Sequence, residues 1–155
     1  MANQARMPLF DRLIDLDPTT QREKRPLRTL GREDLLESVR LELERLFSTR
    51  SGFPGRRLEG LPLTVIDYGI PDFGWTSAAS TEDREYFAAA LAESVRAFEP
   101  RLAEPKVILE PAPRGEDGLV CRIEGRLLTG EAAEPVAFMT SFAARHNGVK
   151  VHAVS

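Results

Sequence analysis

Residues 119–127, Leu-Val-Cys-Arg-Ile-Glu-Gly-Arg-Leu, decide the fold class because apolar or small residues alternate there with mostly charged ones. A period of two is typical of a β-strand that buries one face. A second such stretch follows, and its inward face would carry Val136, Phe138, Thr140, Phe142 and Ala144. With residues 106–110 before these stretches and residues 149–154 after them, the sequence predicts a four-stranded antiparallel meander.

The last hairpin is marked by Asn147-Gly148, a dipeptide that favours two-residue turns. A turn of that length would place Ala143 opposite His152. It would also put His146 and His152 on opposite faces of the sheet, because neighbouring side chains along a strand alternate. We therefore expect the two histidines not to share a metal ion.

Residues 32–48 show a helical period instead of a period of two. Their apolar side chains recur every three or four positions, at Leu35, Leu36, Val39, Leu43, Leu46 and Phe47. Glu33 and Asp34 would lie in the first turn, where the helix dipole favours negative charge. This pattern predicts an amphipathic helix with one apolar face.

A second amphipathic helix is predicted over residues 81–98. Ser80 is a favourable N-cap, and Pro100 ends the helix because it disfavours helical backbone at Glu99. The apolar face would consist of Phe87, Leu91, Val95 and Phe98. Two helices on one face of an antiparallel meander give an α+β domain, which we place at residues 32–155.

The segment between the helices is harder to assign. Residues 51–62 are rich in Gly and Pro and predict a loop. Residues 63–72 form a short apolar run, for which periodicity does not separate a strand from a short helix. Because Gly69 followed by Pro71 resembles the end of a helix, we interpret this run as a turn of helix.

Residues 1–31 differ in composition from the rest and are interpreted as an N-terminal arm. Its basic residues include Arg22, Lys24, Arg25 and Arg28, and its short apolar run contains Leu9, Phe10 and Leu13. A helix of one or two turns that begins at Pro8 would be too short to be stable alone. The arm is then either a solvated tail or a segment that becomes ordered on a partner.

Composition excludes several classes of protein. The 155 residues carry 21 Lys+Arg and 24 Asp+Glu, a formal charge of −3, which argues against a general nucleic-acid binder. No apolar run approaches the ~18 residues of a membrane span, and the first residues lack the apolar region of a secretory signal. Cys121 is the single cysteine, so neither an internal disulfide nor a cysteine-based zinc site is expected. These observations favour a cytosolic protein without metal or cofactor.

Catalytic chemistry finds little support in the sequence. There is no Gly-x-Ser-x-Gly motif and no phosphate loop. Asp67, Asp72 and Glu99 are the carboxylates in ordered, apolar surroundings, and a glycosidase would need two carboxylates across a cleft. The alternative is that all three have structural or interface roles, and we favour that alternative.

Glu99 is the most informative single residue. It would lie at the end of a helix, where the dipole disfavours a negative charge. Arg101 follows two residues later and could form a bidentate ion pair with it. The pair could lie within the domain or reach across an interface, and the remaining alternative is an exposed, unpaired acid.

Three motifs and an early segment carry a family resemblance. They are Leu46-Phe47-Ser48-Thr49-Arg50, Ile66-Asp67-Tyr68-Gly69-Ile70-Pro71-Asp72, Phe98-Glu99-Pro100-Arg101-Leu102 and Leu9-Phe10-Asp11-Arg12-Leu13. In this order they resemble the TssE family, the small baseplate component of the bacterial type VI secretion system. The chain is likewise similar to the "lysozyme-like" wedge protein of contractile phage baseplates.

This resemblance implies a structural role. Family members act in the baseplate wedge with TssF and TssG, and the resemblance implies contact with TssK through the wedge. They resemble the handshake domain of the sheath subunits TssB and TssC, so the chain is expected to start sheath polymerisation by β-augmentation. It would act in the cytoplasm, in a baseplate docked at the inner face of the cytoplasmic membrane, without inserting into it. The interaction motifs would be Asp67, Tyr68, Gly69, Pro71, Asp72, Glu99, Pro100 and Arg101.

Two other functions remain possible at this stage. A muramidase-like peptidoglycan hydrolase would rest on the carboxylates and on the "lysozyme-like" label. A free-standing cytosolic adaptor would use the same fold with different surfaces.

Overall fold

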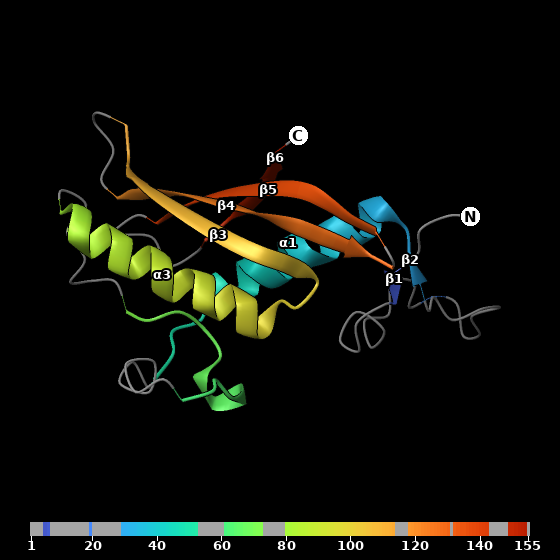
Figure 1. The fold of residues 1–155 in the computed structure, drawn as a ribbon, viewed down its shortest axis with the longest axis horizontal. Coiled ribbons are helices and arrows are strands. Elements are labelled where there is room, and N and C mark those ends of the chain that lie inside the picture. The colour runs from blue at the N-terminus through green and yellow to red at the C-terminus, as the bar shows by residue number, and fades with distance from the viewer. Residues whose placement is uncertain are drawn as a thin grey trace.

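The alternating stretches form one antiparallel sheet with the strand order β3-β4-β5-β6 (Figure 1). The strands span Leu102–Pro111 (β3), Leu119–Thr129 (β4), Ala132–Phe142 (β5) and Val151–Val154 (β6). The computed structural model describes residues 5–6, 19, 29–52, 61–72, 80–113, 118–130, 132–142 and 149–154. The predicted meander is confirmed.

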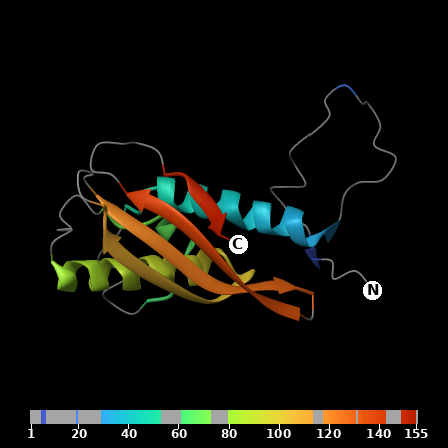
Figure 2. The ribbon, with the colours of Figure 1, turned by 90° about the horizontal axis from the view of Figure 1, so that it is seen from above.

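Two long helices have the bounds that the sequence predicted, Arg32–Ser48 (α1) and Thr81–Phe98 (α3). The Ser80 side chain accepts a hydrogen bond from the Asp83 N–H at 3.2 Å, as expected of an N-cap. Both helices lie against the same face of the sheet (Figure 1 and Figure 2). The predicted α+β class is therefore confirmed.

The core lies between this helical layer and the sheet. Phe142 on β5 packs edge to face against Phe47 of α1 and Phe87 of α3, with ring centroids 5.9 and 5.7 Å apart. The inward residues of β4 are buried as the alternation predicted: Leu119, Cys121, Ile123 and Leu127. Cys121 is fully buried in this core, and burial raises the pKa of its thiol to about 12.

The register of the last hairpin differs from the prediction. His152 lies opposite Met139, four residues away from the expected Ala143. The connection from Phe142 to Val151 is much longer than a two-residue turn, although Asn147-Gly148 itself lies outside the described residues. Because the shift is an even number of residues, His152 keeps its predicted outward face and is exposed.

Three smaller features complete the fold. Ala5–Arg6 (β1) pairs with Thr29–Leu30 (β2) just before α1, which the sequence did not predict. The predicted turn of helix within residues 63–72 is present as Val65–Asp67 (η1), a 3-10 helix. On β3, a bulge falls between Ala103 and Lys106, where Glu104 has a φ of 52°.

Candidate functional site

The chain turns sharply from α3 into β3 at Glu99-Pro100-Arg101. The Glu99 N–H closes the helix on the Val95 carbonyl oxygen at 2.8 Å, and the Glu99 carbonyl oxygen accepts from the Leu102 N–H at 3.1 Å. Pro100 is exposed at the outside of this turn. Side chains at either end of Pro100 are therefore held in fixed directions.

Glu99 and Arg101 pair with each other inside this turn. Arg101 donates from Nε to Glu99 Oε1 at 2.8 Å and from Nη2 to Oε2 at 2.5 Å. The Arg101 backbone N–H also donates to Oε1, at 3.1 Å. The Glu99 side chain is 1% exposed and that of Arg101 is 19% exposed. Of the alternatives left by the sequence, the structure shows a pair within the domain, with a buried carboxylate and a partly buried guanidinium.

The pair is also tied to α1. Arg101 Nη1 donates to Ser38 Oγ at 2.7 Å, and Ser38 is buried on α1. Sequence reasoning missed Ser38. A signal was present, since a serine beside Val39 and one turn after Leu35 places a polar group on the apolar face of the helix.

The second motif begins with Asp67, which closes η1. Its Oδ2 accepts hydrogen bonds from the Thr64 N–H and the Thr64 hydroxyl, each at 2.8 Å. The side chain is 1% exposed. This geometry gives Asp67 a capping role in the local backbone.

The motif then joins the end of α1. The Ile70 N–H donates to the Thr49 carbonyl oxygen at 2.9 Å, and the Ser51 N–H donates to the Ile70 carbonyl oxygen at 2.8 Å. Gly69 makes this approach possible: its φ is 117°, and a Cβ there would lie 2.6 Å from the Thr49 oxygen. The first two family motifs are thus neighbours in space.

Tyr68 connects the second motif to the third. Its ring packs edge to face against Phe98 at 5.3 Å, one residue before Glu99. Its hydroxyl donates to Glu42 Oε1 on α1 at 2.8 Å. Burial, and secondly the Glu42 hydrogen bond, raise the pKa of the Tyr68 phenol. The second motif therefore links the first motif, at the end of α1, to the third motif, at the end of α3.

The remaining motif residues lie beside the contacts between the first and second motifs. Arg50 Nη1 donates to the Phe47 carbonyl oxygen at 3.1 Å. Burial lowers the pKa of the Arg50 guanidinium, while the charge of Asp72 acts in the opposite direction. Pro71 is buried and Asp72 is exposed. The three candidate carboxylates consequently have separate settings: Asp67 caps η1, Glu99 binds Arg101, and Asp72 faces solvent.

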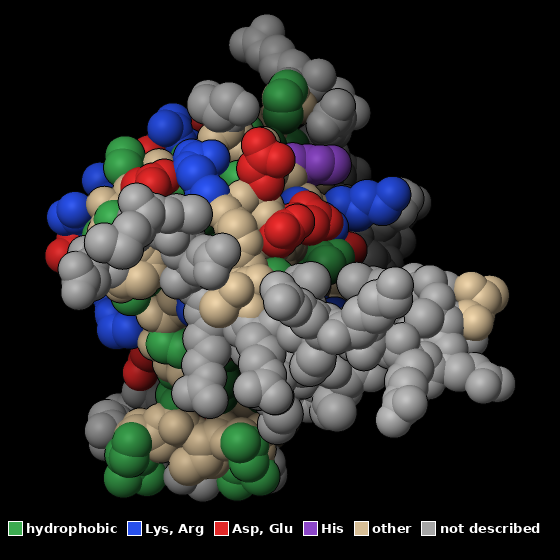
Figure 3. All heavy atoms as spheres, turned by 90° about the vertical axis from the view of Figure 1, so that its right-hand side faces the viewer, with side chains coloured by type: hydrophobic (Ala, Val, Ile, Leu, Met, Phe, Trp, Pro, Cys, Tyr) green, Lys and Arg blue, Asp and Glu red, His purple; other side chains and the backbone are tan. Residues whose placement is uncertain are grey.

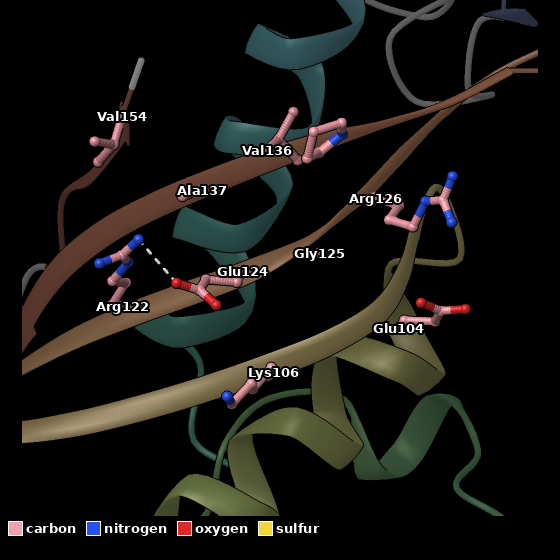
Figure 4. A pocket seen from close by; sticks show the side chains of 10 residues that line it. Glu104, Lys106, Arg122, Glu124, Gly125, Arg126, Val136, Ala137 and Val154 are labelled. Carbon is pink, nitrogen blue, oxygen red and sulfur yellow. Dashed lines mark ion pairs between the residues drawn. The ribbon is translucent and has the colours of Figure 1, made fainter.

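Two hollows of about 510 Å³ each lie elsewhere on the described surface. One lies on the outer face of the sheet, where Figure 4 shows Lys106, Arg122, Glu124 and Arg126 spread over β3 and β4. The Arg122–Glu124 ion pair there measures 2.8 Å. The second lies between α1 and β6 and is lined by Glu37, Arg40, Glu44 and residues 150–153. Both hollows contain acidic and basic groups together.

The described residues contain no group of three or more His, Cys, Asp or Glu side chains placed to hold a metal ion. None of the helices in these ranges is long and apolar enough to cross a membrane. The predicted arm residues Leu9, Phe10, Leu13, Arg22, Arg25 and Arg28 lie outside the described residues, as does His146.

Comparison with known proteins gives one result. No curated protein matches the chain significantly. Residues 33–132 match the protein family described as baseplate wedge protein gp25. This span covers well over half of the chain and includes all of α1 except Arg32, all of α3, β3 and β4, and all three linked motifs. The chain therefore belongs to the baseplate wedge protein gp25 family.

Proposed function

We propose that this protein is a structural component of the type VI secretion baseplate wedge, where it joins TssF and TssG and starts assembly of the TssB/TssC sheath by β-augmentation. The single observation that carries the proposal is the family match over residues 33–132, which supports a structural role in a baseplate. The sheet supports the finer mechanism because it is open, with β3 and β6 at its two edges. An open edge offers main-chain groups to an added strand.

The linked motifs give the wedge partners a rigid surface. Buried Glu99 and partly buried Arg101 fix the start of β3 to α1, and Tyr68 fixes the end of α3 to the same helix. Exposed Pro100 and Asp72 lie at the outside of this assembly. We propose that TssF and TssG contact this surface, that TssK is reached through the wedge, and that the N-terminal arm, residues 1–31, docks on these partners.

The proposed role is non-enzymatic and cytoplasmic, in a baseplate at the inner face of the membrane. Glu99 supports the non-enzymatic role because both of its oxygens accept hydrogen bonds from Arg101 inside a turn. A general acid must instead reach a substrate oxygen. We expect no clearing of a purified peptidoglycan suspension by the protein. Clearing that is lost in a folded Glu99→Gln variant would contradict the structural role.

Co-expression tests the proposed function. The tagged chain is produced with untagged TssF and TssG, and sheath assembly is followed with fluorescent TssB in cells that lack the chromosomal copy. We expect co-purification of both wedge proteins, and sheaths only where the chain is supplied. Sheaths of normal number in cells without the chain would refute the role in initiation, and failure to retain either wedge protein would refute the role in the wedge.

A further inference from the structure

The two edges of the sheet differ in how their main-chain groups are occupied. Successive residues of an antiparallel strand direct their N–H and C=O groups alternately to the two sides. Just after β3, the Ala112 N–H donates toward β4, to the Gly118 carbonyl oxygen at 3.1 Å. Every second residue before Ala112, back to Lys106, therefore directs its main-chain N–H and C=O groups toward β4 as well. Val107, Leu109 and Pro111 therefore direct their main-chain groups to the open side of β3.

On the opposite edge, α1 supplies side chains to the main chain of β6. Arg40 Nη1 donates to the Val151 carbonyl oxygen at 3.0 Å, and Glu44 Oε2 accepts from the Val151 N–H at 3.3 Å. Arg40 and Glu44 are themselves paired at 2.8 Å. A guanidinium and a carboxylate thus occupy the donor and acceptor positions that a neighbouring strand would use. Figure 3 shows the mixture of acidic and basic side chains around a histidine on this side of the molecule.

The part of β5 that extends beyond β6 is covered in a similar way. By the same alternation, Ala133 and Pro135 face outward there. Arg126 Nη2 donates to the Ala133 carbonyl oxygen at 3.1 Å, and proline has no N–H to offer. Ala153 on β6 is the outward residue left between these covered positions.

The β3 edge has a continuous accepting stretch instead. In the part of the chain that the structure describes, no side chain is hydrogen-bonded to the outward main-chain groups of Val107 or Leu109. The stretch is bounded by Pro111 at one end and by the bulge at Glu104 at the other. Natural sheets use prolines and bulges to limit pairing at an edge. Here they leave residues 106–110 of β3 available for pairing with an added strand.

We propose that residues 106–110 of β3 accept one extended strand of a sheath subunit, and that Arg40 and Glu44 close the opposite edge against strand addition. This inference rests on the proposed function and adds to it which edge is used and what protects the other. The added strand would alternate in character. Its apolar residues would face the helices beside Val107 and Leu109, and its polar residues would lie beside exposed Lys106 and Glu110.

Hydrogen–deuterium exchange of the full chain, alone and with purified TssB/TssC, tests the edge directly. We expect slower exchange in peptides that cover residues 102–111 and no change in peptides that cover residues 149–154. Protection of the β6 peptides alone would overturn the edge assignment but leave β-augmentation in place. Binding without protection of either strand would refute β-augmentation, and no binding would refute the proposed initiating role itself.

Proline substitutions provide the matched variants. Val107→Pro and Ala153→Pro each remove one outward N–H from an edge strand without removing a ladder hydrogen bond. We expect Val107→Pro to reduce sheath-subunit binding at least tenfold and Ala153→Pro to leave it unchanged, with both folds checked by circular dichroism. The reverse order would overturn the assignment. If Val107→Pro does not fold, the hydrogen–deuterium exchange of the unmodified chain tests the edge assignment, by whether peptides of β3 or of β6 become protected.

Opening the protected edge tests the second half of the proposal. The double variant Arg40→Ala with Glu44→Ala should self-associate through β6, which light scattering would detect as a larger mass than that of the unmodified chain. The control is Arg122→Ala with Glu124→Ala, which removes an ion pair from the outer face of the sheet. Equal masses for both double variants would show that Arg40 and Glu44 do not protect this edge.

Discussion

Charged side chains tie α1 to the sheet at two places, and the carboxylates at these places differ in their access to water. Arg101 reaches α1 from the start of β3 and is held by Glu99, with side chains 19% and 1% exposed. Arg40 and Glu44 reach β6 from α1, with side chains 21% and 33% exposed. The first network lies inside a turn, and the second lines an open groove.

Ion pairs of similar geometry contribute differently to the free energy of unfolding when the burial of their charges differs. If one member of an exposed pair is removed, water solvates the other member, so such pairs contribute at most about 1 kcal/mol. If one member of a buried pair is removed, a charge remains without water or partner, which costs about 3–5 kcal/mol. We therefore assign the Glu99 network to holding the fold and the Arg40 network to covering the β6 edge.

The largest effect is expected at the buried pair. Arg101→Ala should lower the free energy of unfolding by about 3–5 kcal/mol, because it leaves the Glu99 carboxylate, which is 1% exposed, without its partner. Urea denaturation followed by circular dichroism measures this change. Glu99→Gln, which preserves the side-chain shape, should lose less. A loss below 1 kcal/mol for Arg101→Ala would make the pair equivalent to a surface contact.

Gly69 is expected to show the next largest effect, by a different cause. Gly69→Ala would put a Cβ 2.6 Å from a backbone oxygen at a φ of 117°, so it should destabilise the protein by more than about 1 kcal/mol. Gly52→Ala is the control, since a Cβ there meets nothing within 4 Å. Thermal melts of the two variants should differ clearly. Equal melting temperatures would show that the Thr49–Ile70 connection relaxes at little cost.

Tyr68→Phe extends the comparison of the two ion pairs to a hydrogen bond with an uncharged donor. Loss of the 2.8 Å hydrogen bond to Glu42 should lower stability by about 1 kcal/mol. Because the pKa of Tyr68 is raised, its stabilising effect is present below its ordinary pKa of about 10 and is lost as the pH rises through the folded-state pKa. The stability difference between the variant and the unmodified chain, measured by urea titration, should therefore be present at pH 8 and shrink as the pH is raised above 10. A constant difference would contradict the assigned hydrogen bond.

The smallest effect is expected where Arg40 pairs with the more exposed carboxylates of Glu37 and Glu44. Arg40→Ala should cost about 1 kcal/mol or less, and the loss should shrink in high salt. Arg40 also donates from Nε to Glu37 Oε2 at 2.8 Å, and this hydrogen bond lowers the pKa of Glu37. The small stability from that contact is therefore present above the ordinary glutamate pKa of about 4.3, and it disappears as the pH falls through the lowered pKa. Urea midpoints at two salt concentrations and at pH 7 and 3 measure both dependences. A salt-independent loss above 3 kcal/mol would remove the contrast with Glu99.

Local features of the fold were predictable from the sequence. Both long helices have the predicted bounds because their limits depend on nearby residues, such as the Ser80 cap and Pro100. The faces of β4 followed from its alternation alone. The β5–β6 register was not predictable in this way, because a turn dipeptide does not fix the length of the connection.

The candidate site was predictable only in part. The Glu99–Arg101 pair followed from a helix end and a nearby opposite charge. The link to Ser38 joins residues 63 positions apart, and the contact of Tyr68 with Phe98 depends on how the helices pack. Such long-range contacts are set by the tertiary arrangement and carry no local pattern. The family roles of these residues remain a proposal.

Two double-mutant cycles, measured by urea denaturation under one set of conditions, test the central contrast most directly. One combines Glu99→Ala with Arg101→Ala, and the other combines Arg40→Ala with Glu44→Ala. We predict a coupling energy of about 2–3 kcal/mol for the first pair and below about 0.5 kcal/mol for the second. Equal coupling energies, or a larger value for Arg40 and Glu44, would contradict the assignment of one network to the fold and the other to the sheet edge.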